Sequence, residues 1–264
     1  MQNEDIFMLY KTIKGIFFSS RFLVAVLVML SIYFFNIDLF CWKDMVYHSS
    51  KTYDMIYLTV IFYSPMKPLY KLLPVVAVIP IISNNVYYLK FDYNYLILQR
   101  ISYKRYIINR MLTQSIVCGF ALFMASLMFY IILALFGVPF YNGDERHDWQ
   151  YVKVWSKNQD VIGFLVFHLT GKFFLGAFCA LVVEIISTVV NNQTAIISLI
   201  FMVFHIIQKV FGIDLVAFSG GESNAAGFLS LPYNAFIYYN GVLFILIIIL
   251  AILNMTFMKE RAYR

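Results

Sequence analysis

Charged residues are scarce in this chain. Only 13% of its 264 residues are Asp, Glu, Lys or Arg, whereas 62% are hydrophobic and the mean hydropathy is +0.77. Soluble domains carry about 25% charged and about 45–50% apolar residues. A water-soluble domain cannot hide this much apolar surface, which excludes a soluble fold for most of the chain.

Groups that do chemistry are also few. The three cysteines, Cys41, Cys118 and Cys179, are too scattered for a disulfide framework, and two of them lie in apolar segments where a thiol behaves as a small hydrophobic group. The four histidines fall in different segments without the spacing of metal ligands. The sequence contains no H-E-x-x-H or G-x-S-x-G motif and no Walker-type phosphate loop. We therefore expect no catalytic residue, no metal site and no cofactor on this chain.

Long apolar blocks are what the sequence has in abundance. About 20 helical residues cross a bilayer core, and lipid offers no partner for an unpaired backbone amide. The alternating pattern of a barrel strand is absent, so each block is predicted to be a helix. The sequence thus predicts an all-α integral membrane protein, with residues 1–264 forming one domain. Its six transmembrane helices are expected at about residues 17–36, 72–89, 111–136, 161–190, 194–213 and 237–258.

The basic residues predict the orientation of these helices. Five of them lie between Lys90 and Arg110, and cytoplasmic loops of membrane proteins are rich in Lys and Arg. The start, residues 1–5, is acidic and polar, and no cleavage site follows the first apolar block, so we expect no cleavable signal peptide. Both termini are predicted to be cytoplasmic in a multi-pass protein of the cytoplasmic membrane. In the first outer loop, the apolar run Met55–Ser64 is too short to span, which predicts a surface or re-entrant helix.

One segment, Lys67–Leu112, carries a functional signal. It combines a proline-bearing apolar helix, in which Pro74 and Pro80 can introduce kinks, with a basic, tyrosine-rich stretch that leads into the third span. This arrangement resembles the type-2 ABC exporter permeases, in which a second span of the form LLP…A…P is followed by an acidic position and a basic run. The matching residues are Leu72, Leu73, Pro74, Ala77, Pro80, Asp92, Arg100, Ser102, Lys104, Arg105 and Tyr106.

The resemblance extends to the layout of the whole chain. An amphipathic cytoplasmic helix is expected over residues 1–16, followed by six spans and a short basic tail. One departure is the junction at residues 84–88, Asn-Asn-Val-Tyr-Tyr, where family members more often carry acidic residues.

The resemblance implies a non-catalytic transport subunit. A separate ABC ATPase would drive the movement of this subunit. The contact would be a cytoplasmic coupling helix between spans 2 and 3, at about residues 88–103, which sits in a groove of the ATPase. Two copies of that ATPase would bind ATP and Mg, and a second permease, either an identical copy or a sister chain, would complete the transporter within membrane lipid. No nucleic-acid partner is expected. The residues predicted to couple to the ATPase are Phe91, Asp92, Tyr95, Leu98, Arg100, Ser102, Lys104 and Arg105.

Ionisable residues also occur inside the fourth predicted span. His168 and Lys172 are four residues apart and share a helix face, while Glu184 lies near the inner end. Such groups are costly in a bilayer and tend to face protein, water or a substrate path. One interpretation is a cargo pathway lined by these three residues. The other is a helix break near Gly171, with Lys172 reaching outward or paired with another helix.

Small residues in the spans predict close helix packing. Gly176 and Ala180 form a small-xxx-small pair, as do Ala121 and Ala125.

The predicted function is export of an amphipathic cargo, with an antimicrobial or toxin peptide favoured. Export of drugs or lipids by the same machinery is one alternative. A membrane scaffold or immunity protein that does not transport is the other.

Overall fold

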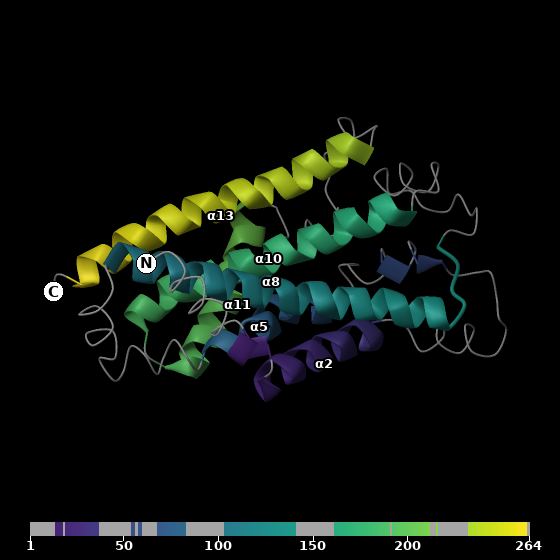
Figure 1. Cartoon of the computed structure of the whole chain (residues 1–264), viewed down its shortest axis with the longest axis horizontal. Helices are drawn as coiled ribbons and strands as arrows, with labels where there is room; N and C mark the ends of the chain where they lie inside the picture. Colours follow the sequence, from purple (N-terminus) through teal and green to yellow (C-terminus); the bar gives the residue numbers. More distant parts are fainter. Residues whose placement is uncertain are drawn as a thin grey trace.

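The chain folds into a bundle of long helices, in which α8 and α10 lie side by side with α13 along one side and α2 along the other (Figure 1). The computed structural model describes residues 14–17, 19–36, 54–55, 58–59, 68–82, 103–140, 161–190, 192–211, 215 and 232–262. These residues contain helices and turns and no strand. The all-α fold is therefore confirmed for the described part of the chain.

Four of the helices are long and apolar enough to cross a membrane. Their apolar stretches are Arg105–Leu135, Val161–Val189, Gln193–Val210 and Ile237–Phe257. They belong to α8 (Tyr103–Leu135), α10 (Val161–Val189), α11 (Gln193–Phe211) and α13 (Pro232–Ala262). These helices match the third to sixth predicted spans and give the described chain the character of a membrane protein.

The other two predicted spans correspond to shorter helices. The helix α2 (Ser20–Phe35) has 16 residues, which gives a length of about 24 Å against a bilayer core of about 30 Å. The second predicted span begins with a 3₁₀ turn, η1 (Pro68–Leu72), which continues into α5 (Leu73–Ala77). Residues 83–89 of that span lie outside the described residues, as do residues 1–13 of the predicted amphipathic helix.

Proline accounts for the interruption in the second predicted span. Pro74 lies in the first turn of α5, where its missing N–H costs nothing. Pro80 cannot donate to the carbonyl of Val76 and its ring crowds that carbonyl, so α5 ends at Ala77. A turn at Val78 follows, and helical residues resume at 79–82.

The helix α8 begins eight residues before the predicted third span, at Tyr103 instead of Met111. The prediction marked the start of the apolar block, but backbone hydrogen bonding continues through the preceding polar turns. Ile107 is buried in this extension and packs with Leu181 of α10. The basic segment therefore passes directly into the longest helix of the bundle.

The directions of the helices follow from their contacts. Arg110 meets Glu184 at one end of the α8–α10 pair and Tyr130 meets His168 at the other, so these helices are antiparallel. The helix α2 runs parallel to α8, because Phe17 just before α2 contacts Phe120 and Tyr33 near its end contacts Ser126.

The helix α13 runs parallel to α10. Phe167 contacts Tyr239 near the start of both helices, and Leu181 contacts Asn254 near the end of both. Besides α8 and α13, α10 also packs against α11 and α5. It is therefore the central helix of the bundle.

Glycine permits the close approach of α8 and α10. A Cβ added at Gly119 would lie 2.8 Å from the carbonyl oxygen of Phe173, and one added at Gly176 would lie 2.7 Å from the Cα of Gly119. Ala121, Ala125 and Ala180 are fully buried. The predicted packing role of these small residues is confirmed where the two backbones touch.

Four described residues of the segment predicted as the first outer loop pack against the bundle. The N–H of Met55 donates to the carbonyl of Pro139, and the hydroxyl of Thr59 lies 3.0 Å from that of Tyr130 in α8. Leu58 is fully buried. This part of the loop therefore caps the end of α8 instead of standing free of it.

Candidate functional site: a buried ion pair at the start of α8

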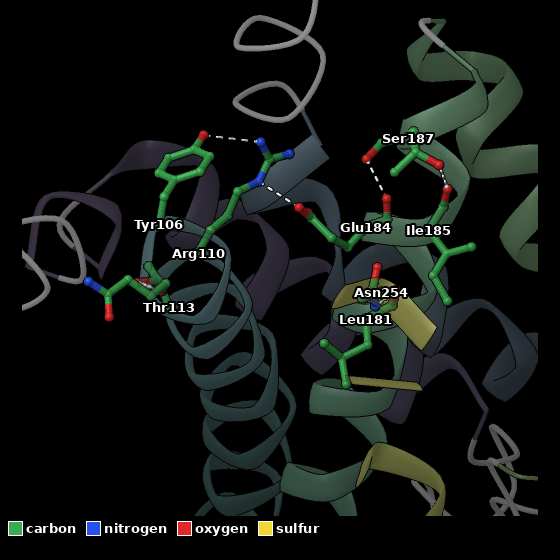
Figure 2. Close-up of polar contacts among 10 residues, drawn as sticks. Tyr106, Arg110, Thr113, Leu181, Glu184, Ile185, Ser187 and Asn254 are labelled. Atoms are coloured by element: carbon green, nitrogen blue, oxygen red, sulfur yellow. Dashed lines mark hydrogen bonds and ion pairs between the residues drawn. The ribbon is translucent and has the colours of Figure 1, made fainter. Parts of the chain in front are cut away.

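A buried ion pair joins the beginning of α8 to the end of α10. Nε of Arg110 lies 2.7 Å from Oε1 of Glu184, and the two side chains are 7% and 1% exposed. Nη1 of Arg110 also donates to the hydroxyl oxygen of Tyr106, one turn earlier, at 3.3 Å. Figure 2 shows the Arg110 side chain reaching from α8 towards α10 with Tyr106 beside it. The guanidinium is therefore held between a hydroxyl on its own helix and a carboxylate on the next.

The antiparallel arrangement of α8 and α10 creates this pair. Arg110 lies two turns into α8 and Glu184 lies one to two turns before the end of α10, so both are at the same level of the bundle. Removing one partner of a buried pair leaves an uncompensated charge and costs about 3–5 kcal/mol. The pair consequently opposes any separation of the two helices at this end.

A third helix joins the same end of the bundle. Nδ2 of Asn254 in α13 donates to the backbone carbonyl of Leu181 in α10 at 3.1 Å, and Asn254 is fully buried. Leu181 itself packs with Ile107 and Met111 of α8. The ion pair and the Asn254 amide, whose residues are labelled in Figure 2, thus join α8, α10 and α13 where α8 begins. The apolar contacts of Leu181 add to this connection.

The predicted coupling residues lie next to this cluster along the chain. Lys104 and Arg105 fall in the first turn of α8, and Tyr103 is the first residue of that helix. The remaining coupling residues lie outside the described residues, namely Phe91, Asp92, Tyr95, Leu98, Arg100 and Ser102. The structure therefore describes the point at which the predicted coupling segment enters the bundle.

His168 and Lys172 lie together in the interior, in the part of α10 away from the ion pair. They are 1% and 0% exposed, and they interact electrostatically. The imidazole of His168 stacks on Phe164 at 6.0 Å and meets the ring of Tyr130 edge-on at 5.5 Å. The helix continues unbroken past Gly171, so the helix break that would turn Lys172 outward is not present.

Glu184 does not belong to that interior group. It lies twelve residues after Lys172 on the same helix, a distance of about 18 Å along the axis. The three residues predicted as a cargo pathway therefore divide into the His168–Lys172 pair and a carboxylate that is paired with Arg110.

Arg110 and Asn254 were missing from the predicted site. The sequence does carry a signal for Arg110, because Glu184 is the only acidic residue in the six predicted spans and needs a cation at its own depth. Arg110 immediately precedes the third predicted span, at the same predicted membrane boundary. Asn254 has no comparable signal, since one asparagine in an apolar helix does not reveal its partner.

Comparisons with family models, with curated proteins and with solved structures find no match to this chain. Within the described ranges, no three His, Cys, Asp or Glu side chains lie close enough together to hold a metal ion. The arguments for function consequently rest on the residues of this chain alone.

Proposed function

We propose that the chain is the permease subunit of an ATP-driven ABC exporter in the cytoplasmic membrane. It has six spans, both termini are cytoplasmic, and it catalyses no reaction itself. Two cytoplasmic ATPase subunits bind ATP and Mg, and a second permease completes the pathway. The cargo is amphipathic, and a peptide is the class we favour.

The observation that carries this proposal is the polar cluster at the start of α8. A permease without a nucleotide site must receive mechanical work from outside, through the segment that contacts its ATPase. Here the basic segment that resembles a coupling helix continues into α8, and α8 is tied to α10 by Arg110 and Glu184 within two turns. A displacement of that segment would therefore move α8 and α10 together instead of bending α8 alone.

The helix directions also support the proposal. In a six-span chain with a cytoplasmic N-terminus, the first and third spans run outward while the fourth and sixth run inward. The helices α2 and α8 are parallel, and α10 and α13 run opposite to them. Under this proposal the Arg110–Glu184 pair lies at the cytoplasmic end, where the ATPase would bind.

Co-purification with an ATPase tests the proposal. An affinity-tagged chain is extracted from the membranes of its native host in mild detergent, and proteins that remain bound are identified by mass spectrometry. We expect an ABC ATPase whose ATP turnover rises when the chain is present. Recovery of the folded chain without any ATPase would contradict the proposal and favour a scaffold or immunity protein.

Charge reversal locates the contact. Arg105→Glu, at the start of α8, is expected to reduce ATPase recovery, because it reverses a charge beside the coupling segment. Lys209→Glu, near the end of α11 and predicted to lie on the outer side, is the matched control and should leave recovery unchanged. Equal recovery with both variants would place the ATPase contact elsewhere.

A further inference from the structure

The second predicted span contains a turn with reduced backbone hydrogen bonding. The N–H groups of Ile81 and Ile82 both donate to the carbonyl of Val78, at 3.0 and 3.1 Å, so the bonds after the turn converge on one carbonyl. Pro80 has no N–H to donate to the carbonyl of Val76. Fewer backbone hydrogen bonds therefore cross this turn than cross a turn of an uninterrupted helix.

The part of the span before the turn is fixed to the rest of the bundle. Nζ of Lys71 in η1 donates to Oε1 of Gln208, near the end of α11, at 3.1 Å. Tyr70 and Leu73 are 2% and 0% exposed, and α5 packs against α2, α8, α10 and α11. A side-chain hydrogen bond and contacts with four helices thus hold η1 and α5 in place.

The part of the span after the turn leads towards the predicted coupling segment. Ile82 is the last described residue before Tyr103, where α8 begins, and the predicted coupling residues that precede α8 lie between these two. A displacement of the coupling segment would therefore reach the bundle at two places. One is α8, which is continuous and is tied to α10 through Arg110 and Glu184. The other is the second predicted span, in which a proline interrupts the hydrogen bonding.

We propose that residues 78–80 form a hinge in the exporter. When the coupling segment is displaced, α8 and α10 move as one body, and the second span bends at the hinge because η1 and α5 stay in place. Ile81 and Ile82 are buried in the same apolar core as α8 and α10, so they follow those two helices. A hinge of this kind is a few residues at the end of an element that absorb a change in backbone angles. The inference rests on the proposed function for the source of the movement.

Pro74 provides a control within the same span. It lies in the first turn of α5, where a backbone N–H has no helical partner, so Pro74→Ala leaves the helical hydrogen bonding unchanged. Pro80→Ala, by contrast, adds an N–H that can donate to Val76, in a residue that favours a straight helix. Pro80→Gly adds the same N–H in a residue that keeps the backbone free to bend. The three variants therefore separate the loss of a proline from the loss of flexibility.

Hydrogen–deuterium exchange of the chain alone, in lipid nanodiscs, tests the hinge without an ATPase. We expect peptides that cover residues 75–82 to exchange faster than peptides from the middle of α10, because amides exchange fastest where local opening costs least. Pro80→Ala should slow this exchange, whereas Pro74→Ala and Pro80→Gly should not. Native exchange as slow as that of α10, or exchange that Pro80→Ala leaves unchanged, would overturn the inference.

ATP turnover by the co-purified ATPase tests whether the hinge is used. Coupling between distant sites typically amounts to about 5–150-fold, so Pro80→Ala should lower the stimulation of turnover by at least about fivefold at equal amounts of bound ATPase. Pro80→Gly should retain most of the stimulation, and Pro74→Ala should match the native chain. Native stimulation with Pro80→Ala would overturn the inference. An equal loss with Pro80→Gly would also overturn it, because the proline would then have a structural role only.

Failure of the proposed function gives a different result. A folded native chain that recovers no ATPase would contradict the proposed function. Fast exchange at residues 75–82 that Pro80→Ala slows would still support a hinge in that case, and slow exchange would overturn it.

Discussion

The α8–α10 pair and the outer helices α11 and α13 use apolar sequence in opposite ways. In the apolar stretches of α8 and α10, 56% and 72% of the residues are buried inside the protein, against 11% and 17% for α11 and α13. All four stretches are strongly hydrophobic, so hydropathy alone does not separate them. Among the described residues, the α8–α10 contact combines two glycines at which the backbones touch with a buried ion pair, whereas a Cβ at Gly241 of α13 meets nothing within 4 Å.

This difference shows where the chain itself supplies stability. Between α8 and α10 the backbones touch at Gly119 and Gly176, and the Arg110–Glu184 pair closes one end. The apolar stretches of α11 and α13 are mostly not buried within the chain, so their outer faces are suited to contact with lipid or another chain. Substitutions at the α8–α10 contact should therefore lower the stability of the folded chain. Substitutions on the outer faces of α11 and α13 should affect assembly with another chain or have no effect.

The largest effect is expected where the two backbones touch. Gly176→Leu places a side chain against the backbone of Cys118 and Gly119, which cannot move aside without separating α8 from α10. We expect loss of the monodisperse peak in size-exclusion chromatography of the detergent extract. Gly241→Leu is the matched control, since a Cβ at Gly241 in α13 meets nothing within 4 Å. If Gly176→Leu and Gly241→Leu gave the same elution profile, the α8–α10 contact would not be more sensitive to added volume than α13.

The ion pair should give the next largest effect. Arg110→Met or Glu184→Met leaves one buried charge alone, which should lower the stability of the bundle by about 3–5 kcal/mol. The double Met variant should lose much less, because it leaves no unpaired charge. The midpoint of thermal unfolding in detergent measures all three. Additive losses in the double variant would mean that the two charges do not interact.

Two asparagines of α13 should give the smallest effects. Asn254→Leu removes the hydrogen bond to Leu181, and such bonds within membrane proteins contribute about 0.6 kcal/mol on average. Asn240 is also buried, but neither polar atom of its side-chain amide has a hydrogen-bond partner among the described residues. Asn240→Leu should therefore be neutral or stabilising. A lower unfolding midpoint for Asn240→Leu would show that its amide has a role outside the described contacts.

The sequence predicted the helices of the bundle well where they are long and uninterrupted. The predicted block 161–190 coincides with α10 almost to the residue, because apolar length and helix length are the same there. The start of α8 was wrong by eight residues, since helical hydrogen bonding continues into polar sequence. The two predicted spans at residues 17–36 and 72–89 stay predictions as membrane crossings, because their described helices are short.

The candidate site was only partly predictable. Glu184 and Lys172 stood out as charges in an apolar helix, but the identity of the partner of Glu184 depended on the arrangement of α8 and α10. Arg110 was assigned to a cytoplasmic loop because it precedes the apolar block, and the burial of its side chain follows from the contact with Glu184. The coupling function of Phe91 to Ser102 stays a prediction, since those residues lie outside the described part of the chain.

The most direct test of the account is ATP turnover by the co-purified ATPase, measured with the native chain and with Glu184→Gln at equal amounts of assembled complex. This substitution preserves the shape of the side chain but removes the charge that holds Arg110. If the ion pair transmits movement of the coupling segment to the bundle, the Glu184→Gln variant will still bind the ATPase. This variant will then stimulate ATP turnover less than the native chain does. Exchange of the two residues, Arg110→Glu with Glu184→Arg, should restore part of the stimulation. Stimulation that is unchanged by Glu184→Gln would contradict the account.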